Sequence, residues 1–396
     1  MPHLLVDISA HGFGHVGQTA PVVNELAQRL PGLRVTLRTA APGYLLKQRF
    51  RCDFQHIPAA FDFGMQMANA VDVEVEKSAA AYRAFHADWE EKVGREAHVL
   101  RALKPDLLLA NVPYLSLAAA HVAGVSAVAM CSLNWADIYR HYCAGDASSR
   151  KIHAQMLEAY NSAECFFKMQ PAMPMPDFIN TRSINPVAQA GCNQRVQLAA
   201  KLQLAEAEKL VLVAMGGMDF RLPMENWPPL PGIRWIIPQA WGVERENMAI
   251  LENLGLPFGE VLASCDAVLT KPGYGTFVEA ACAGVPVLYV TRHDWPEEPY
   301  LVNWLNQHGI CVEVERGRLQ KGEMGDVLAQ TWLMPKPPRP NGHDKYAAPD
   351  NETRDARFPL SGSPPAGESD EVSLREFHVK ATGAAEVAQH ILANYF

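Results

Sequence analysis

The chain of 396 residues lacks any uninterrupted apolar run of about 18 residues, the length that a membrane-spanning helix requires. Its eight cysteines are scattered, and no two have the Cys-x-x-Cys spacing, which argues against a disulfide scaffold or a zinc ribbon. Basic residues are in the minority, 35 against 43 acidic ones, so general binding of nucleic acid or anionic membranes is not favoured. No basic segment with an apolar core behind it stands at the start. We therefore expect a cytoplasmic protein with reduced thiols.

Short apolar runs and amphipathic stretches alternate along both halves of the chain. The runs indicate strands at 4–9, 34–39, 107–110 and 126–131, and again at 210–214, 234–237, 266–270 and 285–290. The stretches between them indicate helices at 19–30, 44–50, 114–123, 258–264, 276–283 and 299–307. Alternation of this kind predicts parallel sheets. Given the length, we expect an α/β fold of two Rossmann-like, doubly wound domains facing each other across a cleft.

The expected domains are residues 1–185 and 186–333. Apolar residues recur every three or four positions from 75 to 103, which predicts one long helix. Residues 334–370 are rich in Pro, Gly, Ser and charged residues, so we expect a disordered insertion there. A terminal helix is expected within 371–396, packing back on the domains, with Ser373 and Glu376 as a possible capping box.

A glycine-rich turn joins the first expected strand to the first expected helix. Gly12, Gly14 and Gly17 have the G-x-G-x-x-G spacing of dinucleotide-binding turns, where glycine lets the backbone approach a ligand. A nicotinamide site also needs an acidic residue about 20 residues further on. The second strand ends with Arg38 and Thr39 instead. An arginine there could suit the 2′-phosphate of NADP, so an NADP-dependent oxidoreductase stays open as an alternative.

His11 and His15 lie on the same turn. A turn at the carboxyl edge of a parallel sheet faces the crevice where such folds bind ligands. Either imidazole could therefore remove a proton near neutral pH. The alternative is that each histidine only bonds the backbone of the turn. A metal site is disfavoured because no third ligand is evident, and we expect neither a metal nor a cofactor.

Two glycine-rich segments follow strands of the second half. Gly216 and Gly217 come after the strand at 210–214, and Gly273 and Gly275 come between the strand at 266–270 and the next helix. Backbone N–H groups at such a helix start favour phosphate. A plain tight turn would explain the first glycine pair equally well.

Three carboxylates accompany these glycines. Glu279 lies one turn into the helix and could accept hydrogen bonds from ribose hydroxyls, although Thr276 and Glu279 also have the spacing of a capping box. Glu297 and Glu298 lie in the loop after the strand at 285–290 and could hold sugar hydroxyls. The alternative for this pair is a solvated acidic loop that leads into the next helix.

Together these segments resemble the GT-B nucleotide-sugar glycosyltransferases. The histidine turn at 14–21, the strand with two glycines at 210–217, and the block at 270–287 occur in the family's order. The most similar groups are the N-acetylglucosaminyltransferase that makes lipid II and the UDP-glycosyltransferases. Residues 134–139 and 297–299 are also similar to the amino-terminal domain of plant-type arabinose kinases. The resemblance covers about residues 1–333 and the last helix.

The resemblance implies roles for individual residues. His15 would be the general base, and Glu279 would contact the ribose. The other residues expected to bind substrate are Gly14, His11, Gly216, Gly217, Gly273, Tyr274, Gly275, Thr276, Glu297 and Glu298. The family's usual acidic residue followed by Gln is replaced here by two glutamates, which leaves the donor sugar open.

The expected function is transfer of a sugar from a nucleoside-diphosphate sugar, UDP-linked by family default, to an unidentified hydroxyl acceptor. Inversion at the anomeric carbon and independence from metal are expected with it. A nucleotide-sugar 2-epimerase of the same fold and a non-catalytic nucleotide-sugar-binding protein are the alternatives. The expected partners are donor and acceptor, without nucleic acid, and the oligomeric state is left open.

Overall fold

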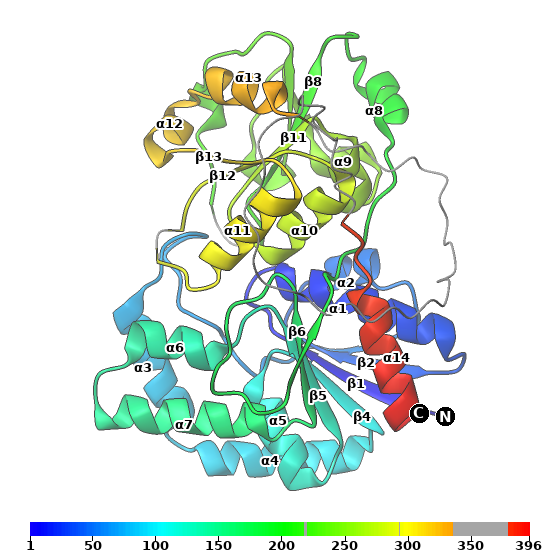
Figure 1. The fold of residues 1–396 in the computed structure, drawn as a ribbon, viewed down its shortest axis with the longest axis vertical. Helices are drawn as coiled ribbons and strands as arrows, with labels where there is room; N and C mark the ends of the chain where they lie inside the picture. The colour runs from blue at the N-terminus through cyan, green and yellow to red at the C-terminus, as the bar shows by residue number, and fades with distance from the viewer. Residues whose placement is uncertain (218–219, 293, 336–378) are drawn as a thin grey trace, which may run out of the picture.

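The computed structural model describes residues 1–217, 220–292, 294–335 and 379–396. Its strands form two sheets, of seven and six strands, and every ladder between the named strands is parallel. The N-lobe, residues 1–184, surrounds the first sheet, and the C-lobe, the described part of residues 195–335, surrounds the second. Figure 1 shows the C-lobe above the N-lobe. The expected α/β class with two parallel-sheet units is confirmed.

The N-lobe sheet has the order β3-β2-β1-β4-β5-β6-β7. Its strands are β1 (His3–Ile8), β2 (Arg34–Arg38), β3 (Gln55–Ile57), β4 (Leu107–Asn111), β5 (Ala127–Cys131), β6 (Cys165–Met169) and β7 (Thr181–Ile184). Its helices are α1 (Gly14–Arg29), α2 (Gly43–Arg49), α3 (Val75–His86), α4 (Trp89–Leu103), α5 (Tyr114–Ala123), α6 (Trp135–Cys143) and α7 (Ala147–Asn161). The inner strands are covered by helices on both faces, which explains their continuous apolar runs.

The C-lobe sheet has the order β10-β9-β8-β11-β12-β13. Its strands are β8 (Lys209–Ala214), β9 (Ile233–Ile237), β10 (Met248–Ile250), β11 (Ala267–Thr270), β12 (Val287–Tyr289) and β13 (Cys311–Glu313). Its α-helices are α8 (Arg195–Leu202), α9 (Phe258–Ser264), α10 (Tyr274–Ala283), α11 (Glu298–His308), α12 (Arg316–Lys321) and α13 (Gly325–Leu333). Three 3₁₀ turns lie at η1 (Met224–Asn226), η2 (Gln239–Trp241) and η3 (Leu251–Leu254).

The single helix expected over 75–103 is wrong, because the chain breaks between α3 and α4. The apolar periodicity continues across the break, since both helices pack on the same core. The Phe85 carbonyl at the end of α3 accepts a hydrogen bond from the Lys92 ammonium, 2.7 Å away, which replaces a lost helical partner. Beside the break, the rings of His86 and Trp89 stack with centroids 4.8 Å apart.

The terminal helix α14 (Gly383–Tyr395) returns to the N-lobe and packs along α1, as the red helix of Figure 1 shows. Its Tyr395 hydroxyl donates to Glu164 Oε2 at 2.9 Å. A Cβ at position 383 would lie 2.1 Å from the Asn185 carbonyl oxygen, so only glycine permits this docking. The helix begins later than expected, since residues 379–382 are not helical. The possible capping box at Ser373 and Glu376, and positions 336–370 of the expected insertion, lie outside the described residues.

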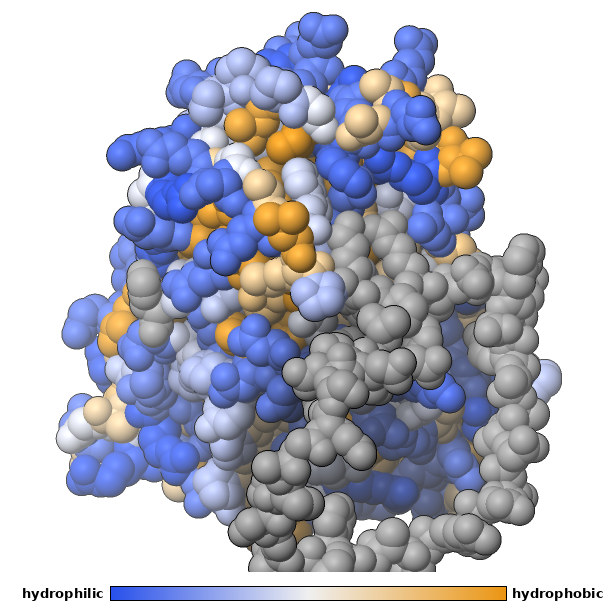
Figure 2. Space-filling model, turned by 45° about the horizontal axis from the view of Figure 1, so that its top comes forward, coloured by the Kyte–Doolittle hydropathy of each residue, from blue (hydrophilic) through white to orange (hydrophobic). Residues whose placement is uncertain are grey.

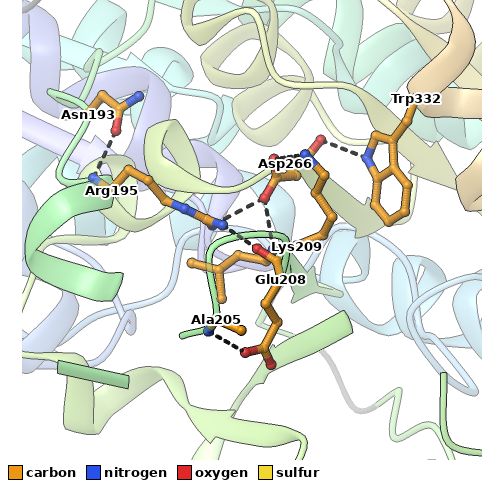
Figure 3. Close-up of polar contacts among 8 residues, drawn as sticks. Asn193, Arg195, Ala205, Glu208, Lys209, Asp266 and Trp332 are labelled. Carbon is orange, nitrogen blue, oxygen red and sulfur yellow. Dashed lines mark hydrogen bonds and ion pairs between the residues drawn. The ribbon is translucent and has the colours of Figure 1, made fainter. Parts of the chain in front are cut away.

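An ion cluster fixes the amino ends of β8 and β11, at the sheet edge opposite the glycine-rich loops (Figure 3). The Asp266 carboxylate pairs with the Arg195 guanidinium at 3.1 Å and the Lys209 ammonium at 3.4 Å, and it accepts from the Leu210 N–H at 2.9 Å. The Trp332 indole donates to the Asp266 carbonyl at 3.3 Å and attaches α13 to the same point. These contacts are structural and belong to the base of the C-lobe.

The visible face in Figure 2 is mostly polar, with small separated apolar patches. Within the described ranges, no helix combines the length and the apolar character that crossing a bilayer demands. The eight cysteines lie in the described part of the chain, and none of them forms a disulfide.

Candidate functional site

The carboxyl edges of the two sheets meet between the lobes. The loops after β1, β4 and β5 come from below, and the loops after β8, β11 and β12 come from above. A Cβ on Gly217 would lie 2.4 Å from the ring of Phe13, so glycine permits the lobes to touch at this point. Gly216, directly before it, has a φ of +84°, which also favours glycine. The sequence-predicted residues of both halves are therefore brought together at one interlobe cleft.

His15 lies in the first turn of α1, which begins at Gly14 and not at the expected position 19. Its ring is buried, and Nδ1 is 2.9 Å from Oδ1 of Asn111 at the end of β4. The expected alternative, a bond to the turn's own backbone, is wrong for this histidine. Burial lowers the pKa of His15 to about 4, with a smaller contribution from the charge of Lys271 in the other lobe. The imidazole is therefore neutral at pH 7 and can accept a proton.

His11 lies beside His15 but in an aromatic environment. Its ring stacks on Trp295 of the C-lobe at 6.1 Å between centroids and meets the edge of Trp135 at 5.0 Å. Its Nε2 is buried and has no hydrogen-bond partner among the described residues. Burial, and then the neighbouring His15, keep the pKa of His11 well below its usual value. His11 is thus a neutral wall of the cleft with one unsatisfied nitrogen.

A pocket of about 470 Å³ opens beside His11. Its lining residues are Ala10, His11, Gly12, Asp62, Phe63, Met65, Gln66, Met67, Ala68, Asn69 and Gly217. Asp62 is buried and accepts hydrogen bonds from the Ser9 hydroxyl at 2.9 Å and the Trp135 indole at 2.7 Å. Burial raises its pKa to about 6 despite these bonds. Sequence patterns did not single out Asp62, because it lies in a loop without periodicity.

On the C-lobe side, the start of α10 is open towards the cleft. Its N-cap is Gly273, no side chain caps it, and the first turn has no acidic residue. The N–H groups of the first turn, which include those of Tyr274, Gly275 and Thr276, have no partner within the helix. The capping box expected at Thr276 and Glu279 is wrong, because Thr276 is already the third helical residue and Glu279 the sixth.

One cation stands next to this helix start, and the charge of a second acts on it. The Lys271 ammonium is near enough that a Cβ on Gly273 would lie 3.6 Å from it, and one on Gly216 would lie 3.9 Å away. It makes no hydrogen bond or ion pair with the residues that the structure describes. The Arg292 guanidinium lies 3.7 Å from the ring centroid of Trp295, and its buried Nε has no partner in the described part of the chain.

Burial lowers the pKa of both cations. Burial, and then the charge of Arg292, lower the pKa of Lys271 to about 7. Burial lowers the pKa of Arg292 to about 10, while Glu297 and Glu298 act in the opposite direction. Both residues lie in segments considered for their glycines and carboxylates, yet neither cation was predicted to act. Their position at the ends of β11 and β12 is the signal that could have indicated them.

Glu297 and Glu298 are both buried, so the expected alternative of a solvated loop is wrong. Glu297 Oε1 accepts from the Ser132 hydroxyl of the N-lobe at 2.6 Å, and its Oε2 accepts from the Trp295 indole at 3.3 Å. Glu298 Oε2 accepts from the Arg292 backbone N–H at 2.9 Å. Glu297 therefore joins the loop after β12 to the N-lobe, whereas Glu298 bonds the backbone of that loop.

Glu279 and Tyr274 of α10 are also tied to neighbouring structure. Glu279 Oε1 accepts from Nη1 of Arg49 on α2 at 2.5 Å, across the lobe boundary. The Tyr274 hydroxyl donates to the Gln170 carbonyl at 3.0 Å and accepts from the Val187 N–H at 2.8 Å. The Tyr274 side chain thus anchors the segment between the lobes, and only its backbone N–H faces the helix start.

The NADP alternative depended on Arg38, and the structure overturns it. The Arg38 guanidinium is 2% exposed and forms two hydrogen bonds to the Asp7 carboxylate, at 2.7 and 2.6 Å. It also donates to Glu96 at 2.5 Å. These carboxylates occupy the side chain that would have to hold a 2′-phosphate.

No protein-family model matches the sequence. The chain is 25% identical over 344 residues to the L-arabinokinase of Arabidopsis thaliana, a match that covers 81% of this chain and 31% of that protein. The chain thus spans less than a third of that enzyme's length.

Solved structures share the fold at low identity. The calicheamicin glycosyltransferase CalG4 matches with a TM-score of 0.57 and 16% identity, covering 99% of this chain and 98% of that one. Arabidopsis thaliana UGT89C1 complexed with UDP matches with a TM-score of 0.52 and 15% identity, covering 84% and 91%. The spinosyn rhamnosyltransferase SpnG matches with a TM-score of 0.51 and 15% identity, covering 84% and 92%. At these identities the likeness shows a common fold.

Proposed function

From the premise that the chain has the GT-B fold, we propose that it transfers a sugar from a nucleoside-diphosphate sugar to a hydroxyl acceptor bound between the lobes. The observation that carries this proposal is the pair Lys271 and Arg292 at the uncapped start of α10, opposite the neutral imidazole of His15. Cationic side chains with free hydrogen-bond donors, beside backbone N–H groups that have no partner in the helix, can bind a diphosphate. They would stabilise the negative charge that grows on the diphosphate as it leaves the sugar.

The donor would lie with its diphosphate between Gly216, Gly217 and the α10 start. Gly273, Gly275 and Thr276 would offer backbone N–H groups, and Lys271 and Arg292 would compensate the charge. UDP is the nucleotide we infer, because UGT89C1, with which the chain shares its fold, was solved with UDP. Because the chain itself supplies the cations, we propose transfer without a metal and expect activity to persist in a chelator.

The acceptor hydroxyl would approach from the N-lobe. His15 would remove its proton through Nε2, a step that contributes roughly 10²–10⁴-fold in rate. Attack from the side opposite the leaving diphosphate inverts the anomeric centre. The pocket beside His11 and Asp62, with its apolar wall of Phe63, Met65 and Met67, is the space we assign to the acceptor. Binding both substrates in one cleft supplies a further part of the acceleration.

The test is to follow UDP release from a panel of UDP-sugars mixed with hydroxyl acceptors, for the wild-type chain and His15→Ala. We expect release that depends on an acceptor, and its loss in the variant. Product of retained anomeric configuration, identified by NMR, would contradict the inverting mechanism. Conversion of the UDP-sugar without any acceptor would instead identify a 2-epimerase.

A second candidate is a protein that binds nucleotide sugars without turning them over. The favouring observation is that Glu279 and Glu297, both expected to hold donor hydroxyls, are already bonded to Arg49 and Ser132. UDP binding together with no UDP release from any donor would decide for this candidate.

A further inference from the structure

A continuous chain of hydrogen bonds leads from the His15 ring to the opposite lobe. His15 Nδ1 is 2.9 Å from Asn111 Oδ1, and Asn111 Nδ2 donates to Gln18 Oε1 at 3.1 Å. Gln18 Nε2 donates to Ser132 Oγ at 2.9 Å, and that hydroxyl donates to Glu297 Oε1 at 2.6 Å. All five side chains are buried. Four side chains of the N-lobe thus end on one carboxylate of the C-lobe.

The carboxylate of Glu297, at the end of this series of hydrogen bonds, determines which atom donates in each bond. A carboxylate only accepts, so the Ser132 hydroxyl must donate to Glu297 and can accept only from an N–H of Gln18. The Gln18 oxygen is then left to accept from the Asn111 amide nitrogen. Asn111 consequently presents its oxygen to His15, and an oxygen can only accept. The proton of the neutral imidazole must therefore be on Nδ1, which leaves the lone pair on Nε2.

The thiol of Cys131 supports the same orientation. Its Sγ lies 3.3 Å from Gln18 Oε1 as a donor. Burial raises the pKa of the Cys131 thiol, so it keeps its proton and can donate. The Gln18 oxygen thus receives two donors, and turning the amide over would place an NH₂ group against both of them.

We propose that Asn111, Gln18, Ser132 and Glu297 are positioning residues that hold His15 as the Nδ1–H tautomer. Because Glu297 belongs to the C-lobe, the Ser132–Glu297 contact between the lobes reinforces the orientation that the Cys131 thiol also favours. The imidazole is thereby an acceptor at Nε2. This catalytic meaning rests on the proposed function, but the tautomer itself does not.

The experiment is two-dimensional NMR of the full chain labelled with ¹⁵N-histidine, at pH 7 and without ligand. His15→Asn identifies the His15 signals among those of the 14 histidines. We expect Nδ1 to have the shift of a protonated ring nitrogen and Nε2 that of an unprotonated one. A wild-type His15 with its proton on Nε2 would overturn the proposal.

Two variants test the hydrogen bonds that follow Asn111 in this series. Glu297→Gln keeps the shape but lets Ser132 accept, and Ser132→Ala removes the link, so in both we expect the Nδ1–H pattern to become mixed or reversed. Ser116→Ala is the matched control, because it deletes a buried hydroxyl that has no partner among the described residues, and it should leave the pattern unchanged. An unchanged pattern in both test variants would overturn the proposal that Ser132 and Glu297 help to fix the tautomer. If the His15 pattern changes as expected in the variants but no donor is turned over, the proposed function fails and the positioning of His15 is still supported.

Discussion

Arg49 on α2 and Glu279 on α10 form an ion pair across the lobe boundary, with 2.5 Å between Nη1 and Oε1. The Glu279 side chain is 4% exposed, so removing the arginine would leave a buried carboxylate without its cation. We expect Arg49→Met to lower the free energy of unfolding by about 3 kcal/mol, as measured by urea denaturation.

The Arg29–Glu25 pair on α1 is the control, because it has a similar distance of 2.6 Å but lies at the surface. Arg29→Met should cost about 0.5 kcal/mol or less. An equal loss of unfolding free energy in the two variants would show that burial does not make the Arg49–Glu279 pair more stabilising than a surface pair.

Glu279 was expected to hold the ribose, and this role can be separated from phosphate binding. If its carboxylate accepts from ribose hydroxyls, Glu279→Gln should weaken UDP binding about tenfold, since a hydrogen bond to a charged group contributes roughly 1.5–3 kcal/mol. Inorganic pyrophosphate, which has no ribose, should bind the variant as well as the wild type. An equal loss of affinity for both ligands in calorimetry would show that Glu279 does not contact the ribose.

Lys271 gives donor binding a pH dependence. Its pKa is lowered to about 7, so the free protein loses this charge as the pH rises from 6 to 8, whereas a bound diphosphate would hold the proton. Affinity for a UDP-sugar, whose phosphates do not titrate in this range, should therefore fall above pH 7. Calorimetry in buffers of different ionisation enthalpy should show about one proton taken up at pH 8 and almost none at pH 6.

Lys271→Met is the matched variant for this measurement, and the exposed Lys321→Met is its control. The first should bind weakly and without proton uptake, and the second should behave like the wild type. Proton uptake that persists in Lys271→Met would assign the titration to another group.

The Asp266 cluster of Figure 3 should affect stability without affecting ligands. Asp266→Asn removes the charge that Arg195 and Lys209 share, so the free energy of unfolding should fall by about 1–3 kcal/mol. UDP affinity should not change, because the cluster is at the amino edge of the sheet. The control is Asp326→Asn, an exposed residue paired with Arg318, which should cost about 0.5 kcal/mol or less. An Asp266→Asn variant that keeps its stability but loses UDP binding would contradict a purely structural role for the cluster.

Local patterns in the sequence predicted most of the fold. The strand ends at Ala214 and Thr270 and the glycine stop at Gly284, which has a φ of +63°, follow from residues that are neighbours in the chain. The break after His86 did not follow, because the apolar period continues through it and the Phe85 carbonyl beside it accepts a hydrogen bond from Lys92. The sequence patterns also missed the short strands β3, β6, β7, β10 and β13 and the helices α6, α7, α8, α12 and α13.

The site was predicted in part. His15 and the α10 glycines stood out in the sequence because a glycine-rich turn after a parallel strand lies at the sheet edge where such folds bind ligands. Their partners could not be found in this way, since Asn111 is 96 residues from His15, and Ser132 is 165 residues from Glu297. The first pair depends on which strands are neighbours within one sheet, and the second on how the two sheets face each other, and no local spacing encodes either. The charge of Lys271 was visible in the sequence, but its lack of a partner is a property of the folded cleft.

The most direct test of the central claim is the affinity for UDP of three proteins measured side by side: wild type, Lys271→Met and His15→Ala. We expect the wild type to bind UDP, Lys271→Met to lose about tenfold or more in affinity, and His15→Ala to bind as the wild type does while releasing no UDP from a donor. A wild type that does not bind UDP, or a Lys271→Met variant that binds it equally well, would contradict the assignment of this cleft to a nucleoside diphosphate.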